Sequence, residues 1–177
     1  GGEFTLTEDL KINVPTTLNG DAIINLNGHT LTYTIPAEYQ DKNHELWSKY
    51  MIMTRVADGS SLTFVGDGAV VSDGYIASAN EDGNKDGKVY VDGGNYSGET
   101  CTLFQANGGE VYISGGEFKA AEYNGDYRFT LNHVDSQKNV GKIEVTGGKF
   151  YKYDPAQSAS ENPVMDFVPK GFGAYPE

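Results

Sequence analysis

Cysteine, basic residues and long apolar runs are scarce in this chain. Because Cys101 is the one cysteine, an internal disulfide is excluded. Cys101 is then either a small buried side chain or a reactive thiol. Thirteen Lys and Arg residues against 25 Asp and Glu give a net charge of −12. An acidic surface repels phosphates, so no nucleic acid is expected as a partner. The chain has no apolar run of about 18 residues, so no membrane insertion is expected either.

Proline is also rare, with 6 residues against 23 glycines. Abundant glycine with little proline indicates many tight turns, and an aromatic share of 12% argues against disorder. A length of 177 residues predicts a single domain covering residues 1–177.

One short phrase recurs along the chain, and it is the main structural signal. Clear copies occupy residues 88–96, 110–118 and 142–150, and looser copies occupy 24–31 and 62–70. In each copy, two apolar residues with one residue between them are followed by glycine and then by another apolar residue. The five aligned glycines are Gly28, Gly66, Gly93, Gly115 and Gly147, which gives steps of 38, 27, 22 and 32 residues. A constant phrase at variable steps predicts a solenoid with loops inserted between its strands.

The alternation within each phrase has the period of a β-strand. Its predicted inward pairs are Ile24/Leu26, Leu62/Phe64, Val89/Val91, Val111/Ile113 and Ile143/Val145. A second inward face is predicted at Leu31, Val70, Tyr96, Phe118 and Phe150. With a third strand before each phrase, the predicted fold is all-β: a single-stranded right-handed parallel β-helix of about five coils with three strands each. We expect an opening coil at 3–18, repeat coils at 19–150 and a C-terminal cap at 151–177.

Several segments resemble those of a known group of proteins. They are Leu26-Asn-Gly-His-Thr-Leu31, the opening run from Gly1 to Asp9, Gly147 to Phe150, Asp154-Pro155, and Phe167 to Phe172. Together they are similar to pectin-lyase-like right-handed parallel β-helix proteins exported by gut bacteria. The resemblance implies the same fold and an extracellular or cell-surface location, with the export signal lying outside this sequence. Many members of that group are uncharacterised surface or adhesin-like proteins.

Asp82-Gly-Asn-Lys-Asp-Gly87 matches the start of a calcium-binding loop. Asp82, Asn84 and Asp86 are therefore candidate Ca²⁺ ligands, because oxygen ligands at alternate positions can converge on one hard cation. The twelfth position is Gly93 rather than a bidentate glutamate, so an ordinary Asp/Asn/Gly turn is the competing interpretation. No other cofactor is predicted.

Catalytic candidates are sparse. A polysaccharide lyase needs a basic side chain near a strand face, and the two arginines, Arg55 and Arg128, are open to a second interpretation as surface charges on strands. A glycoside hydrolase needs clustered carboxylates, for which Asp67, Asp73 and Asp92 are candidates that also suit turns. The pattern therefore indicates no catalytic residues, and whether the chain is an enzyme stays open.

Aromatic residues outside the predicted strands are candidates for ligand binding. We expect Tyr39, Trp47, Tyr50, Tyr123 and Tyr127 to lie in or beside loops that interrupt the repeat. Tyr and Trp combine a flat apolar face with a polar tip, which suits sugar stacking, although packing of loops onto the prism is an alternative role.

The sequence favours a non-catalytic extracellular module for adhesion or glycan binding, with a glycan or cell-surface partner. Two alternatives remain: a polysaccharide lyase or glycoside hydrolase, and a structural or phage-tail-like assembly module. The oligomeric state does not follow from the sequence. Recognition is expected where the phrase is interrupted, at residues 36–50, 77–87 and 119–139.

Overall fold

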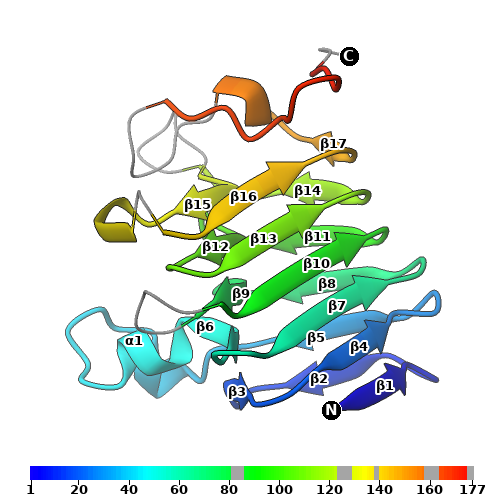
Figure 1. Ribbon diagram of the computed structural model, residues 1–177. Helices are drawn as coiled ribbons and strands as arrows, with labels where there is room; N and C mark the ends of the chain where they lie inside the picture. The colour runs from blue at the N-terminus through cyan, green and yellow to red at the C-terminus, as the bar shows by residue number, and fades with distance from the viewer. Residues whose placement is uncertain (81–85, 123–128, 138–139, 158–163, 175–177) are drawn as a thin grey trace.

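The chain winds into a right-handed parallel β-helix, whose strands form three stacked sheets (Figure 1). The structure is a computed structural model that describes residues 1–80, 86–122, 129–137, 140–157 and 164–174. The predicted fold class is confirmed.

Each of the three sheets is entirely parallel, as expected when a chain returns to the same face once per coil. Sheet A has the order β1 (Gly2–Thr5), β4 (Ala22–Asn25), β7 (Ser61–Val65), β10 (Lys88–Asp92), β13 (Glu110–Ile113) and β16 (Lys142–Val145). Sheet B has the order β2 (Leu10–Ile12), β5 (Thr30–Tyr33), β8 (Ala69–Ser72), β11 (Asn95–Gly98), β14 (Glu117–Lys119) and β17 (Lys149–Phe150). Sheet C has the order β3 (Thr16–Leu18), β6 (Ile52–Val56), β9 (Tyr75–Ala79), β12 (Phe104–Ala106) and β15 (Leu131–His133).

Every coil passes once through sheets A, B and C. In the described part of the chain, β1 to β15 make five complete coils, and β16 and β17 begin a sixth. The short helical elements lie outside the sheets: 3-10 turns at Ala37–Tyr39, Asp135–Gln137 and Pro155–Gln157, and α1 at Trp47–Tyr50. The segment 36–50 therefore contains two short helical elements, the first of which begins after Pro36.

Aromatic and aliphatic ladders fill the centre of the prism. On sheet B, Leu31, Val70, Tyr96, Phe118 and Phe150 pair in sequence across neighbouring strands, which confirms the predicted second inward face. The Tyr96 and Phe118 rings stack with centroids 5.2 Å apart, and the Phe118 and Phe150 rings with centroids 4.6 Å apart. Outside the core, the Tyr90 and Tyr112 rings also stack on adjacent coils of sheet A, with centroids 5.1 Å apart.

The first copy of the phrase is offset from its predicted alignment. Aligning Gly28 with Gly66 would pair Ile24 with Leu62, but in the sheet Ile24 lies opposite Phe64 and Ala22 opposite Leu62. Leu26 is therefore part of the corner and not of the strand, yet it is completely buried. The corners explain the shift. Four residues separate the paired positions Asn25 and Thr30, three separate Val65 and Ala69, and two separate Asp92 and Asn95. The corner between sheets A and B thus becomes shorter over these three coils, and an alignment on glycines alone does not reveal this change in length.

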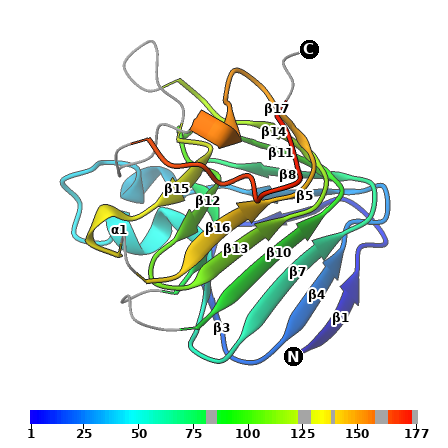
Figure 2. The same cartoon turned by 45° about the horizontal axis from the view of Figure 1, so that its top comes forward.

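Along the chain, each long connection directly precedes or follows a strand of sheet C. The segment 36–50 joins β5 to β6, the segment 80–87 joins β9 to β10, and the segments 120–130 and 134–141 precede and follow β15. By contrast, the corner between sheets A and B is short in every coil (Figure 2). Insertions thus occur next to the strands of sheet C, whereas the corner between sheets A and B has none.

The C-terminal segment lies over the last coil. The Phe167 side chain is buried, and its carbonyl accepts a hydrogen bond from the Val145 N–H of β16 at 2.8 Å. Val164 and Phe172 of the same segment are exposed. Phe167 and the partly buried Met165 therefore pack this segment against the core.

Alkaline pH is expected to destabilise the fold through two buried tyrosines. Burial raises the pKa of the Tyr33 hydroxyl to about 12, although the Arg55 guanidinium lowers it in part. Burial, and to a lesser degree the Asp92 carboxylate, raises the pKa of the Tyr96 hydroxyl. An unfolded tyrosine titrates near pH 10, so the folded state holds these protons more tightly. The stabilisation is complete below about pH 10 and is lost as the pH rises, by about 2–3 kcal/mol for Tyr33 alone.

Urea unfolding followed at several values between about pH 8 and about pH 12 measures this loss. A Tyr33→Phe variant should be less stable at neutral pH, because the Tyr33 hydroxyl donates a 2.6 Å hydrogen bond to the Tyr50 carbonyl. Its stability should nevertheless fall less steeply with pH than that of the wild type. Equal slopes for the two proteins would contradict the assignment to Tyr33.

Candidate ligand-binding groove

The predicted aromatic binders of segment 36–50 pack against the prism. The Tyr39 and Tyr50 rings stack with centroids 4.2 Å apart, the His44 ring meets Tyr39 edge-on at 5.1 Å, and both tyrosines are partly buried against the core. Trp47 is partly buried as well. Their role in ligand binding stays a prediction, and Tyr123 and Tyr127 lie outside the described residues.

Arg55 holds this segment in place and is not the surface charge that one interpretation of the sequence suggested. Its side chain is 7% exposed. Its guanidinium donates to the carbonyls of Ser48 at 2.8 Å, Lys49 at 3.0 Å and Ile52 at 3.3 Å. A guanidinium engaged by carbonyl oxygens inside the fold is poorly placed to act on a substrate, and Arg128 lies outside the described residues.

Of the three candidate calcium ligands, only Asp86 belongs to the described residues. Its carboxylate accepts a hydrogen bond from the Gly59 N–H at 2.6 Å, and its own N–H donates to the Asp58 carboxylate at 3.2 Å. Asp86 thus connects the turn before β10 to the turn before β7 on the neighbouring coil. In the described part of the chain no group of three or more His, Cys, Asp and Glu side chains could hold a metal ion. Calcium binding stays a prediction, since Asp82 and Asn84 lie outside that part.

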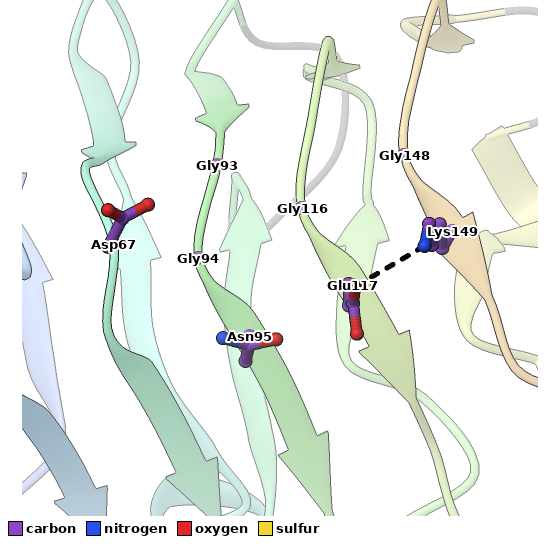
Figure 3. A pocket seen from close by; sticks show the side chains of 8 residues that line it. All are labelled: Asp67, Gly93, Gly94, Asn95, Gly116, Glu117, Gly148 and Lys149. Carbon is purple, nitrogen blue, oxygen red and sulfur yellow. Dashed lines mark ion pairs between the residues drawn. The ribbon is translucent and has the colours of Figure 1, made fainter. Parts of the chain in front are cut away.

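The bare corner between sheets A and B holds a groove of about 420 Å³ that runs across successive coils (Figure 3). Its floor is glycine backbone, and polar side chains stand beside it. The residues that line it are Asp67, Gly93, Gly94, Asn95, Gly116, Glu117, Gly148 and Lys149. Each of these coils contributes one polar side chain to the groove, and neighbouring coils lie about 4.8 Å apart, the spacing of hydrogen-bonded strands.

The corner is free of side chains because two of its glycines have no room for one. A Cβ on Gly94 would lie 2.8 Å from the Leu26 side chain and 3.0 Å from the Tyr96 hydroxyl. A Cβ on Gly116 would lie 3.0 Å from the Gly93 carbonyl oxygen. Both glycines also have a positive φ, 83° and 104°, which other residues rarely adopt. The tight corner that packs the core therefore also leaves the groove open.

The walls of the groove are ordered by hydrogen bonds and charge. The Asn95 side-chain amide donates to the Gly68 carbonyl at 3.2 Å, which fixes one end of its carboxamide. The Glu117 carboxylate and the Lys149 ammonium lie 3.8 Å apart across neighbouring coils, with both side chains largely exposed (Figure 3). Because an exposed pair is weak, both groups can exchange this contact for one to a ligand.

The three aspartates proposed for hydrolysis do not share a site. Asp67 lines the groove, and the Asp92 carboxylate lies at the same corner, 3.5 Å from the position of a Cβ on Gly115. Asp73 lies where β8 leaves sheet B, and its carboxylate accepts a hydrogen bond from the Ile35 N–H at 3.0 Å. Asp73 thus makes a structural contact, which agrees with its alternative interpretation as a turn residue.

The groove opens at its C-terminal end into a larger hollow of about 1030 Å³. Glu117, Gly148 and Lys149 line both, so the two are continuous. Aromatic side chains join the lining here: Phe150, Tyr151, Tyr153 and Phe172. Tyr151 is 48% exposed, and the ammonium groups of Lys119 and Lys152 lie 5.4 and 5.6 Å from its ring centroid.

The outer face of sheet A is a second ordered surface, next to this corner. The Tyr112 hydroxyl donates to the Glu110 carboxylate at 2.7 Å, and Lys88 lies 3.4 Å from the same carboxylate. Burial raises the pKa of Glu110, but these hydrogen bonds and charges outweigh it and lower that pKa overall. Because the Tyr90 and Tyr112 rings cover each other and Lys142 lies over Tyr112 at 4.8 Å, these ring faces are occupied within the protein.

Asn95, Glu117 and Lys149 were not among the site residues predicted from the sequence. A signal was present, because each follows the Gly-Gly pair of the phrase and precedes its aromatic residue. The recurring residues were interpreted as parts of the fold, and recognition was expected in the insertions. The polar character of this one position in all three clear copies indicates that it faces outward at the corner.

Comparison of the chain with protein-family models, with curated proteins and with solved structures finds no significant match. The resemblance to pectin-lyase-like proteins therefore stays an expectation. Among the described residues, no helix is long and apolar enough to cross a membrane.

Proposed function

We propose that this chain is a glycan-binding module of an exported protein, and that it holds an extended oligosaccharide along the corner groove. The observation that carries the proposal is the continuity of the polar groove with the aromatic-lined hollow. An extended sugar chain presents hydroxyl groups at regular intervals, and a row of carboxamide, carboxylate and ammonium groups is suited to bind them. Tyr151 is 48% exposed where the row ends, and a sugar ring could take the place of the Lys119 and Lys152 ammonium groups that lie near its ring.

Charge favours a particular class of glycan. Asp67 and Glu117 line the groove, Asp92 lies at the same corner, and the chain carries a net charge of −12. Lys149 is paired with Glu117, so it does not offset the other carboxylates. Uronic acid polymers and sulfated glycans would be repelled. Neutral oligosaccharides and those with amino sugars are the expected ligands.

Replacing Asn95 with alanine is expected to weaken glycan binding about fivefold to tenfold, because one hydrogen bond to a ligand contributes about 1 kcal/mol. A glycan array of neutral, basic and acidic oligosaccharides identifies the ligand, and isothermal titration measures its affinity. Ser97→Ala is the matched control, since Ser97 lies two residues further along the same strand and outside the groove. Its affinity should equal that of the wild type.

Two further variants separate this proposal from the alternatives. Tyr151→Ala should weaken binding, whereas Tyr39→Ala in the inserted segment should not. The reverse result would move the site to segment 36–50 and overturn the groove. A reducing-end assay with the bound oligosaccharide tests for cleavage, and release of sugar would show that the module is catalytic.

A further inference from the structure

Two carboxylates line the corner groove, and they belong to coils that are two steps apart. Asp67 lies in the corner between β7 and β8, and Glu117 is the first residue of β14 (Figure 3). The coil between them contributes the Asn95 carboxamide. All three side chains are exposed. Because neighbouring coils lie about 4.8 Å apart, the two carboxylates are separated by about 10 Å along the groove.

These carboxylates are only weakly compensated by the protein. The Asp67 carboxylate makes no hydrogen bond or ion pair within the described part of the chain. The Glu117 carboxylate has the Lys149 ammonium at 3.8 Å, and such an exposed pair contributes little. The Asp92 carboxylate adds a further negative charge at the same corner. A ligand that carries its own ammonium groups would therefore gain charge-assisted hydrogen bonds in the groove.

The separation of the carboxylates matches one kind of glycan. In an extended β-(1→4)-linked chain of pyranoses, each sugar advances by nearly one coil spacing and is flipped over relative to the sugar before it. Substituents of alternate sugars therefore lie on the same side of the chain. Ammonium groups on the first and third sugars would then face Asp67 and Glu117, and the second sugar would meet Asn95. The backbone of Gly94 and Gly116 in the floor lets the rings approach closely.

We infer that the groove selects a β-(1→4)-linked oligosaccharide of 2-amino-2-deoxyglucose, with one sugar per coil and the ammonium groups of alternate sugars on Asp67 and Glu117. The inference rests on the proposed glycan site and narrows its ligand to one class. Glu117 exchanges its contact with Lys149 for a sugar ammonium, so Lys149 competes with the ligand. N-acetylation removes the charge of the sugar nitrogen and with it both carboxylate contacts.

Isothermal titration with glucosamine oligomers tests this inference, at a mildly acidic pH where the sugar amines are protonated. The affinity should rise about fivefold to tenfold from the disaccharide to the trisaccharide, because the trisaccharide is the shortest chain whose ammonium groups reach both carboxylates. The N-acetylated trisaccharide should bind more weakly than the amine by a similar factor. Spermidine, a linear triamine without sugar rings, should also bind more weakly than the glucosamine trisaccharide.

Variants of the ion pair assign the contact to the groove. Glu117→Gln should weaken binding of the glucosamine trisaccharide about fivefold to tenfold and abolish its gain over the disaccharide. Lys149→Met should strengthen binding, because it removes the competing cation. Glu144→Gln is the matched control, since Glu144 also pairs with a lysine, Lys142 at 3.1 Å, but lies on sheet A outside the groove. The same change of charge there should alter the affinity less than about twofold.

Failure of this inference and failure of the proposed function give different results. Binding of a neutral glycan that depends on Asn95, with no preference for the amine over the N-acetylated trisaccharide, would keep the glycan site and overturn the selection of amino sugars. Equal affinity for spermidine, or equal effects of Glu144→Gln and Glu117→Gln, would mean that net charge alone acts and would overturn it as well. Absence of binding to every glycan would overturn both.

Discussion

Replacing Phe104 with alanine is expected to lower the free energy of unfolding by about 3–5 kcal/mol. Phe104 comes from sheet C and is completely buried. Its ring lies 6.2 Å from that of Phe64 on sheet A, and 5.3 and 6.0 Å from those of Tyr96 and Phe118 on sheet B. One side chain thus joins all three sheets. The surrounding rings belong to paired strands and cannot close over the cavity that alanine would leave.

Urea unfolding of the purified variant checks this value. Phe172→Ala is the control, because Phe172 is largely exposed and should change the stability by less than about 0.5 kcal/mol. A loss below about 1 kcal/mol for Phe104→Ala would mean that the three sheets do not share one close-packed core.

Replacing Arg55 with methionine is expected to loosen the segment 36–50 and to cost about 3 kcal/mol or more. Methionine keeps much of the side-chain volume but donates no hydrogen bond. The carbonyls of Ser48 and Lys49 at the end of α1 would lose the buried cation that holds them to β6. The β-strands themselves keep their pairing, so the effect should be concentrated in the inserted segment.

Trp47 is the only tryptophan of the chain and lies in that segment, so its fluorescence reports on the change directly. In Arg55→Met the Trp47 emission should shift to longer wavelength and the segment should become sensitive to proteases before the prism unfolds. Lys49→Met removes an exposed cation from the same helix and should leave both signals unchanged. Unaltered fluorescence in Arg55→Met would show that the packing of Tyr39 on Tyr50 holds the segment without Arg55.

Much of the fold was predictable because its signals are local and repeated. The alternation at Val89/Val91 and Val111/Ile113 has the period of a strand, and the same residues pair across β10 and β13. The aromatic residue after each Gly-Gly pair predicted the ladder of Tyr96, Phe118 and Phe150. Such positions obey short-range geometry, which a sequence displays directly.

The errors arose where the chain departs from the repeat. Leu26 has the spacing of a strand residue, but the longer corner of its coil turns it into the core under Gly94. Arg55 follows a strand pattern that suits an exposed charge, and only the return of segment 36–50 over β6 buries it. The burial of Leu26 and of Arg55 thus depends on contacts with residues that are distant in the sequence.

The candidate groove has the same origin. Asn95, Glu117 and Lys149 are separated by 22 and 32 residues in the sequence and meet only because the coils stack in register. The insertions attracted the prediction of binding because they carry Tyr39, Trp47 and Tyr50, yet two of these rings pack on each other.

The sequence by itself determined the architecture, a right-handed parallel β-helix whose inward faces are the recurring apolar residues. Periodicity suffices for this, because the burial of a side chain in a strand follows from its position in the alternation. The tertiary structure decided that Arg55 is enclosed and that a groove follows the glycine corner. These features depend on how residues from different coils meet, and that in turn depends on corner lengths and register that no single stretch of the chain specifies.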